Sequence, residues 1–144
     1  MADTFPKSSI TTEAAHRVIA AAEAKASEIG TPMDIAVVDD SGVLKAFSRM
    51  DGAPLLSIQI SQDKAYTAAG FGMPTHGWHD FIKDDAPLAD GAPTGIDRLV
   101  IFGGGYPIKV DDQVVGAIGV SGGHYTEDQE VAEAGLAALG APVG

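Results

Sequence analysis

Apolar residues in the first part of the chain recur every three or four positions over residues 10–29, which is the pattern of an amphipathic helix. Thr11 precedes this stretch, Glu13 falls in its first turn, and Gly30 follows its last apolar residue. A polar cap, an early acidic residue and a terminal glycine are typical helix boundaries. The sequence therefore predicts a helix that ends at Gly30.

Two pairs of apolar, β-branched stretches follow, and each pair is separated by a turn signal. Residues 33–38 and 43–50 flank the sequence Asp-Asp-Ser-Gly at residues 39–42. Residues 106–110 and 113–120 flank two further aspartates in the same way. Short β-branched runs around such turns are typical of β-hairpins, so the pattern predicts two of them.

The remaining segments predict three more helices, a loop and a further strand. They are helices over residues 55–70, 75–83 and 127–139, a loop over 84–95 and a strand over 98–102. Thr126 and Gln129 have capping-box spacing and are predicted to open the last helix. The element order α-β-β-α-α-β-β-β-α predicts an α+β fold with a five-stranded, mainly antiparallel sheet flanked by helices, because parallel sheets need alternating βαβ units.

The length of 144 residues corresponds to one domain, and no internal repeat or linker divides the chain. We expect a tail over residues 1–9, a single domain over residues 10–140 and a second tail over residues 141–144.

Charge and composition exclude several classes of partner and site. Nine Lys and Arg stand against 20 Asp and Glu, giving a net charge of −11 with no basic stripe, so we expect no nucleic-acid partner. The absence of cysteine excludes disulfides and thiolate metal sites. No apolar run is long enough for a signal peptide or a membrane span, so we expect a cytoplasmic protein without a membrane partner.

Glycine clusters are the strongest local signal. Gly103-Gly104-Gly105 follows a predicted strand, and Gly122-Gly123 ends the second hairpin. Such bends allow a planar or anionic ligand to approach several backbone N–H groups, but tight turns need glycine as well. Neither dinucleotide-binding nor P-loop spacing is present. Ligand binding and turn formation are therefore both open.

The histidines give weak metal signals. His76 and His79 lie three residues apart on a short predicted helix, but no third ligand accompanies them, so no metal site is predicted. His124 follows the second glycine bend and precedes a helix, where an imidazole suits an axial ligand or a hydrogen-bond partner. The alternative is a loop histidine in water.

A few basic residues are candidate anion-binding groups in this acidic chain. Lys64 lies in a helix otherwise filled with small residues, and Arg49 and Arg98 are two of only three arginines. Ser121 lacks the Gly-x-Ser-x-Gly context of a hydrolase nucleophile, and no catalytic triad is recognisable.

Several of these segments together resemble the GlcG/HbpS-like haem-binding family, which includes the C-terminal domain of PduO. The ordered motifs are Asp34-Ile35-Ala36-Val37-Val38-Asp39, Phe47-x-Arg49-Met50-Asp51-Gly52-Ala53, Lys64-Ala65-x-Thr67-Ala68, Gly103-Gly104-x-x-Pro107-Ile108 and Gly116-Ala117-Ile118-Gly119-Val120-Ser121-Gly122-Gly123. The match extends from about residue 10 to residue 140. Asp112 departs from it, since that turn usually reads Asp-Gly in the family. The resemblance implies an α+β domain, a symmetric homo-oligomer, haem binding or degradation in some members, and a place in catabolic operons for others.

The first functional hypothesis is a small-molecule binding protein with haem or another planar cofactor. Lys64 or Arg49 would hold the propionates, and His124, Tyr106 or Thr67 would be axial or distal groups. The complete predicted binding set is Lys64, Thr67, Gly103, Gly104, Gly105, Tyr106, Ser121, Gly122, Gly123 and His124.

The second hypothesis is a cofactor-free isomerase, hydratase or lyase acting on a small organic acid. Arg49 or Lys64 would bind the substrate carboxylate, backbone N–H groups at residues 103–105 would stabilise an oxyanion, and His124 or Asp128 would be the general base. A third hypothesis, a structural accessory subunit, needs none of these residues.

Overall fold

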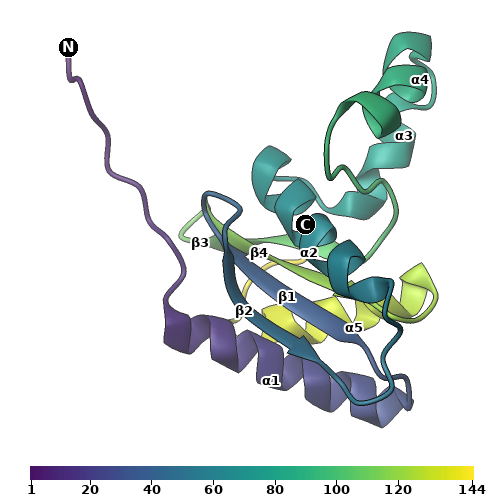
Figure 1. Ribbon diagram of the computed structural model, residues 1–144. Coiled ribbons are helices and arrows are strands. Elements are labelled where there is room, and N and C mark those ends of the chain that lie inside the picture. The colour runs from purple at the N-terminus through teal and green to yellow at the C-terminus, as the bar shows by residue number, and fades with distance from the viewer.

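The computed structural model describes residues 1–144 and contains helices on both sides of one sheet (Figure 1). In chain order the elements are α1 (Thr12–Ile29), β1 (Asp34–Asp39), β2 (Leu44–Arg49), α2 (Ser57–Phe71), the 3-10 turn η1 (Thr75–Gly77), α3 (Trp78–Ile82), α4 (Ala86–Gly95), β3 (Gly105–Val110), β4 (Gln113–Ser121) and α5 (Tyr125–Ala137).

The sheet has four strands in the order β2-β1-β4-β3, and every neighbouring pair is antiparallel. Both predicted hairpins are present, as β1–β2 and β3–β4. Helices α1 and α5 pack side by side on one face, whereas α2 crosses the other face over β4, β1 and β3. The α+β class and the antiparallel pairing are therefore confirmed.

Alternate residues of β1 supply the two sides of the core. Ile35 and Val37 belong to the large cluster beneath α1 and α5, and Ala36 and Val38 pack against α2. On β4, a Cβ atom at Gly119 would fall on the carbonyl oxygen of Ser61 in α2. Glycine at this position lets α2 lie directly on the sheet.

The first helix has the predicted ends. Thr11 accepts a hydrogen bond from the backbone N–H of Ala14, and Gly30 ends the helix in the left-handed conformation at φ 86°. The last helix begins two residues earlier than predicted. His124, not Thr126, is its N-cap, with Glu127 as the reciprocal partner. The imidazole replaces the expected hydroxyl because its Nδ1 accepts from the N–H of Thr126.

The predicted fifth strand over residues 98–102 is wrong. Arg98 has φ 65°, and the following residues pair with no strand. The backbone N–H of Val100 instead donates to Thr67 Oγ1 at 3.1 Å, and Leu99 and Ile101 pack on the small apolar core around Trp78. These apolar side chains are thus partly buried against the core of α3 and α4 without joining the sheet.

The predicted loop over residues 84–95 is also wrong, because most of it forms α4. Asp85 caps this helix by accepting the N–H of Leu88 at 3.3 Å, and Pro87 lies in the first turn, where its missing N–H costs nothing. The prolines and glycines of residues 84–95 led to the prediction of a loop, although Asp85 and Pro87 are typical of a helix start.

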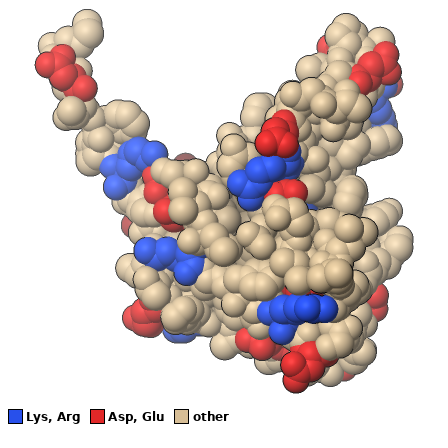
Figure 2. All heavy atoms as spheres, viewed as in Figure 1, with Lys and Arg blue, Asp and Glu red and all other residues tan.

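Helices α3 and α4 project from the body as an arm, and the exposed N-terminal residues 1–9 extend away on the same side (Figure 1). Charged side chains are scattered over the face shown in Figure 2, with large uncharged areas between them. No helix combines the length and the apolar character needed to cross a membrane.

Candidate functional site

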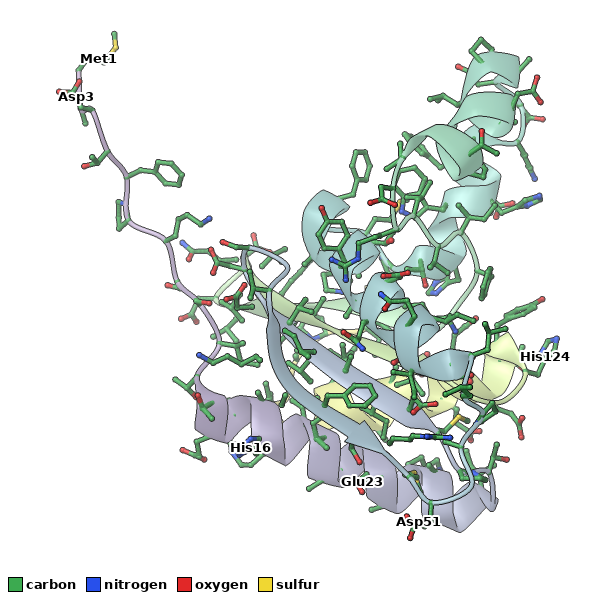
Figure 3. All side chains as sticks on the ribbon, viewed as in Figure 1. Met1, Asp3, His16, Glu23, Asp51 and His124 are labelled. Atoms are coloured by element: carbon green, nitrogen blue, oxygen red, sulfur yellow. The ribbon has the colours of Figure 1, made fainter.

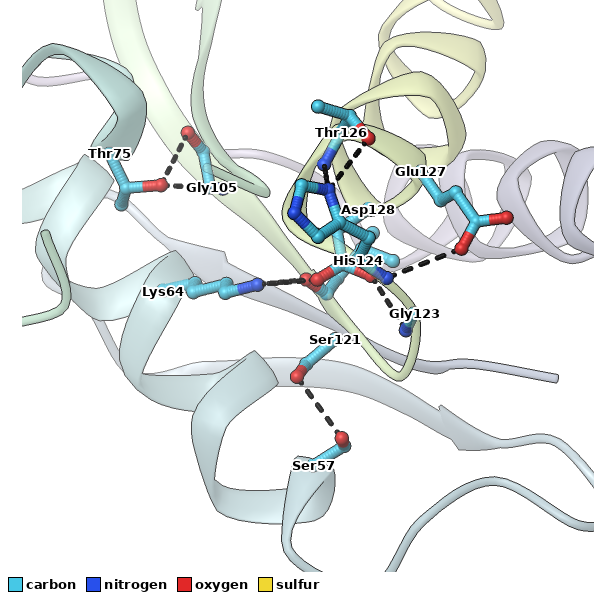
Figure 4. Close-up of polar contacts among 11 residues, drawn as sticks. Ser57, Lys64, Thr75, Gly105, Ser121, Gly123, His124, Thr126, Glu127 and Asp128 are labelled. Carbon is cyan, nitrogen blue, oxygen red and sulfur yellow. Dashed lines mark hydrogen bonds and ion pairs between the residues drawn. The ribbon is translucent and has the colours of Figure 1, made fainter. Parts of the chain in front are cut away.

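The glycine bends, α2 and the start of α5 converge on a buried ion pair (Figure 4). Lys64 Nζ lies 2.8 Å from Asp128 Oδ2 and donates a second hydrogen bond to the carbonyl of Val120 at 2.9 Å. The two side chains are 0% and 3% exposed. The small residues around Lys64 in α2 allow this long side chain to pass between helix and sheet. The three predicted segments are therefore neighbours around one charged centre.

Glycine is needed at Gly104 for the chain to close around this pair, and Gly123 contributes a backbone hydrogen bond. Gly104 has φ 126°, and a Cβ atom there would lie 2.5 Å from the carbonyl oxygen of Val120 and 2.7 Å from Lys64 Nζ. Gly123 donates its backbone N–H to Asp128 Oδ1 at 3.0 Å. Both carboxylate oxygens are thus occupied, and the bend is tied to α5.

Burial dominates the electrostatics of the pair. It lowers the pKa of Lys64 and raises the pKa of Asp128, and in both cases the partner charge opposes the shift. The Nζ atom also lies 5.1 Å from the centre of the Phe102 ring, a cation–π contact. Phe102 separates this buried charge from an exposed surface, since its own side chain is 46% exposed.

The other predicted binding residues around the pair are mostly engaged in internal hydrogen bonds. Gly105 donates its N–H to Thr75 Oγ1 at 2.9 Å, and Thr67 Oγ1 donates to the carbonyl of Arg98 at 3.0 Å. The Ser121 hydroxyl donates to that of Ser57 at 3.1 Å. These contacts fix the walls of the site.

Tyr106 lies nearly buried on β3. Its hydroxyl donates to Glu133 Oε2 at 2.6 Å, and burial together with this carboxylate raises its pKa well above the ordinary value. The ring of His76 approaches the Tyr106 ring edge-on, at 5.5 Å between centroids. Tyr106 thus connects the strand, α5 and the start of the arm.

His124 is exposed at the N-terminus of α5, and its ring lies at the periphery of the molecule (Figure 3), while its backbone carbonyl accepts the N–H of Asp128 at 3.0 Å. Its Nδ1 accepts the N–H of Thr126, and its own backbone N–H donates to Glu127 Oε1 at 3.2 Å. The ring packs against Tyr125 at 4.2 Å between centroids. In this arrangement Nδ1 serves the helix cap.

Arg49 does not join the other candidate residues. It lies on the edge strand β2 opposite Asp34 and donates to the carbonyl of Ala53 at 3.1 Å. Asp34 is fully buried, and neither of its carboxylate oxygens has a hydrogen-bond partner. Burial raises the pKa of Asp34, and the positive charge of Arg49 opposes this shift.

An open cleft of about 380 Å³ adjoins the glycine bend. It is lined by His76, His79, Asp80, Ile101, Phe102, Gly103 and Tyr125. The two histidines come from the base of the arm, Phe102 from the irregular segment after α4, and Tyr125 from the start of α5. The cleft therefore combines two imidazoles with apolar and aromatic walls, directly outside the Lys64–Asp128 pair.

Sequence reasoning did not assign these lining residues, apart from Gly103, to a binding site. The spacing of His76 and His79 was the available signal, but without a third metal ligand it remained weak. Phe102 was expected within a strand and Tyr125 ahead of a helix, so no local pattern brings them to one cleft.

Comparison with known proteins identifies relatives over most of the chain. The sequence profile of the family described as haem degrading protein HbpS-like matches residues 10–137. A 15.0 kDa protein from the dhaT–dhaS intergenic region of Citrobacter freundii is 42% identical over 127 residues, covering 88% of this chain and 89% of that protein. The protein GlcG of Escherichia coli K12 is 38% identical over 107 residues, covering 74% of this chain and 77% of GlcG.

A solved structure agrees with the sequence relationship. The crystal structure of a PduOC–haem complex superimposes with a TM-score of 0.87 at 28% identity, covering 94% of this chain and 98% of that one. The shared fold, the sequence identity and the extent of the profile match lead to one conclusion: this chain belongs to the HbpS-like family.

Proposed function

We propose that the protein binds haem in the cleft between the arm and the start of α5. The observation that carries this proposal is the pairing of two exposed imidazoles, His76 and His79, with the aromatic side chains of Phe102 and Tyr125 around one open cleft. Flat apolar walls suit a porphyrin, and imidazole is a common ligand of haem iron. The haem complex of the related PduOC supports the same ligand class.

The residues of this chain fit the group in distinct roles. His79 is the proposed iron ligand, because His76 already packs against Tyr106 and His124 caps α5. Lys83 Nζ lies 3.1 Å from the carboxylate of Asp80, which lines the cleft, and would be the basic group for a propionate. Haem, when bound, would supply an iron centre for ligand binding or redox chemistry.

The buried Lys64 and Asp128 take a positioning role in this proposal. Their side chains lie behind Phe102 and hold both glycine bends, so they set the shape of the cleft without reaching its surface. Thr67, Tyr106 and Ser121 were predicted to bind the ligand directly. In this proposal they support the walls of the cleft instead, because their side chains are hydrogen-bonded to neighbouring residues.

The enzymatic alternative is not favoured. A substrate carboxylate would have to enter the space already closed around Lys64 and Asp128, and Arg49 lies outside the cleft. If the haem-free protein converted a small organic acid, with loss of turnover in Lys64→Ala, the alternative would replace haem binding.

Titration with haemin tests the proposal, because the chain has four histidines that can be replaced one at a time. We expect a saturable Soret shift at a fixed stoichiometry in the wild type. Loss of the iron ligand in His79→Ala should abolish the ligand-dependent Soret position and weaken binding about tenfold or more. His16→Ala is the matched control on α1, far from the cleft in the fold (Figure 3).

The His124→Ala variant discriminates between two candidate iron ligands. Unchanged spectra in this variant are expected if the ring only caps α5, whereas loss of the Soret shift would identify His124 as the iron ligand. Diffuse haemin association that is equal in all three variants would end the proposal.

A further inference from the structure

A second cleft, which the proposed haem site does not use, lies between the C-terminal half of α2, α3 and the segment after α4. Its volume is about 300 Å³, at the lower end of the range for small-molecule sites. The main lining side chains are Tyr66, Phe71, Trp78, Ile96 and Leu99, with Gly70 in α2 between them. This cleft is more uniformly apolar than the histidine-lined one.

The wall formed by the segment after α4 is held in place by specific contacts. Arg98 adopts the left-handed conformation, pairs with Asp63 at 2.8 Å and lies 4.0 Å over the ring of Tyr66. Thr67 Oγ1 donates to the carbonyl of Arg98 and accepts the N–H of Val100. A non-glycine residue at positive φ persists only where its surroundings enforce it. This wall of the cleft is therefore preformed.

One polar group of the lining has no partner. Trp78 is 5% exposed, and its indole Nε1 is buried without a hydrogen bond. A buried donor without an acceptor is a site of unmet hydrogen-bonding capacity. Phe71 packs on the indole with 5.0 Å between centroids and is itself 57% exposed, so it is the surface ring that a molecule hydrogen-bonded to the indole would have to displace.

We propose that this cleft binds a small uncharged molecule that combines an aromatic or aliphatic ring with a carbonyl or hydroxyl oxygen. The apolar walls would take the ring, and the oxygen would accept the free indole N–H of Trp78. Asp97 at the cleft and the net charge of −11 disfavour an anionic ligand. A flat aryl ketone is the simplest molecule of this class.

Trp78 gives a direct test, because it is the only tryptophan of the chain. The haem-free, ¹⁵N-labelled protein is titrated with acetophenone, and the single indole N–H resonance is followed by NMR. We expect a saturable downfield shift as the hydrogen bond forms. Ethylbenzene, which has the same ring without the oxygen, should bind about 3- to 10-fold more weakly and give no downfield shift.

Gly70 supplies a matched pair of variants. A Cβ atom there meets nothing within 4 Å, so a side chain can grow into the cleft from an intact helix. Gly70→Leu should abolish the acetophenone response, whereas Gly70→Ala should retain it. Should Gly70→Leu not fold, the two probes still decide the question in the wild type.

Two results would overturn the proposal. One is an indole resonance that neither compound shifts; if this resonance moves on protein dilution alone, a second copy of the chain covers the cleft. The other is an equal response to both compounds.

Discussion

At the residue scale, Asp34 and the Lys64–Asp128 pair are buried ionisable groups that differ in their hydrogen bonding. Lys64 has two acceptors and Asp128 two donors, whereas both oxygens of Asp34 lack a hydrogen-bond partner. A buried ionised group that is not hydrogen-bonded disfavours the folded state. The two sites should therefore respond in opposite directions to neutralisation.

Asp34→Asn should stabilise the protein at pH 8. The pKa of Asp34 is raised in the folded state, whereas the unfolded chain has the ordinary value of 3.8. Between these two pKa values, the folded protein binds the Asp34 proton and the unfolded chain does not. The contribution of Asp34 to the free energy of unfolding is therefore most favourable below about pH 4, and it decreases as pH rises through the raised pKa. We expect a gain of about 1 kcal/mol at pH 8, reduced by the nearby Arg49, and almost none at pH 3.5.

Urea unfolding at both pH values measures this difference. Asp51→Asn removes the same charge from an exposed turn and should change little at either pH. A loss of stability in Asp34→Asn at pH 8 would show that the carboxylate is stabilised in the folded protein.

Lys64→Met should destabilise the protein by about 3–5 kcal/mol, because it leaves Asp128 buried without its cation. The loss should grow from pH 5 to pH 8, since ionised Asp128 then lacks a partner. The double variant Lys64→Met/Asp128→Asn should recover part of the loss in a double-mutant cycle measured by denaturant unfolding.

The exposed pair Arg17–Glu13 is the control for this cycle, and Arg17→Met should cost less than about 1 kcal/mol. If the double variant were no more stable than Lys64→Met, the ion pair would not be the source of the effect.

At the element scale, the contact between α2 and the sheet depends on the absence of a side chain at one position. Ser61 and Ala65 of α2 lie directly over Gly119 of β4. This close approach brings Lys64, one turn along the same helix face, to the end of β4 and the glycine bends. Helix position and site geometry are therefore coupled.

Gly119→Ala should destabilise the protein by about 3 kcal/mol or more, because the new methyl group would overlap the backbone of α2. Thermal unfolding measures the change. Gly91→Ala is the control in an open helical position of α4, where alanine should be neutral or stabilise by up to about 1 kcal/mol. Equal melting temperatures for the two variants would contradict the close packing.

At the scale of the whole molecule, the exposed apolar surface and the projecting arm favour self-association. Leu55 and Leu56, ahead of α2, are 74% and 76% exposed, and Phe81 on the arm is 52% exposed. Burial of such side chains between subunits would stabilise an oligomer. We therefore predict that the homo-oligomer expected from the sequence forms through the exposed surface around Leu55, Leu56 and Phe81.

Light scattering coupled to size exclusion should give a mass that is a multiple of 14.7 kDa at micromolar concentration. The variant Leu55→Ser/Leu56→Ser should shift the mass towards the monomer, whereas Val43→Ser, at an exposed turn, should leave it unchanged. A wild-type monomer at 100 μM would falsify the prediction.

The sequence by itself determined the elements whose signals are local. Thr11 and Gly30 fixed the ends of α1 because capping involves only neighbouring residues, and two aspartate-rich turns fixed both hairpins because strand alternation surrounds them. The meeting of Lys64, Gly104 and Asp128 did not follow from local motifs, because these residues come from three separate parts of the chain. The α+β class followed from the order of these elements.

Only the tertiary structure decided what depends on distant partners. Residues 98–102 have the composition of a strand, but Thr67 and the core around Trp78 supply their hydrogen bond and apolar contacts, so they form a cleft wall. His124 resembles a free ligand in the sequence, but the start of α5 uses its Nδ1 as a cap. His79 and Phe102 lie 23 positions apart and line one cleft, because the chain leaves the body in α3 and returns to it after α4. These features depend on packing between residues that are distant in the sequence, which no local pattern specifies.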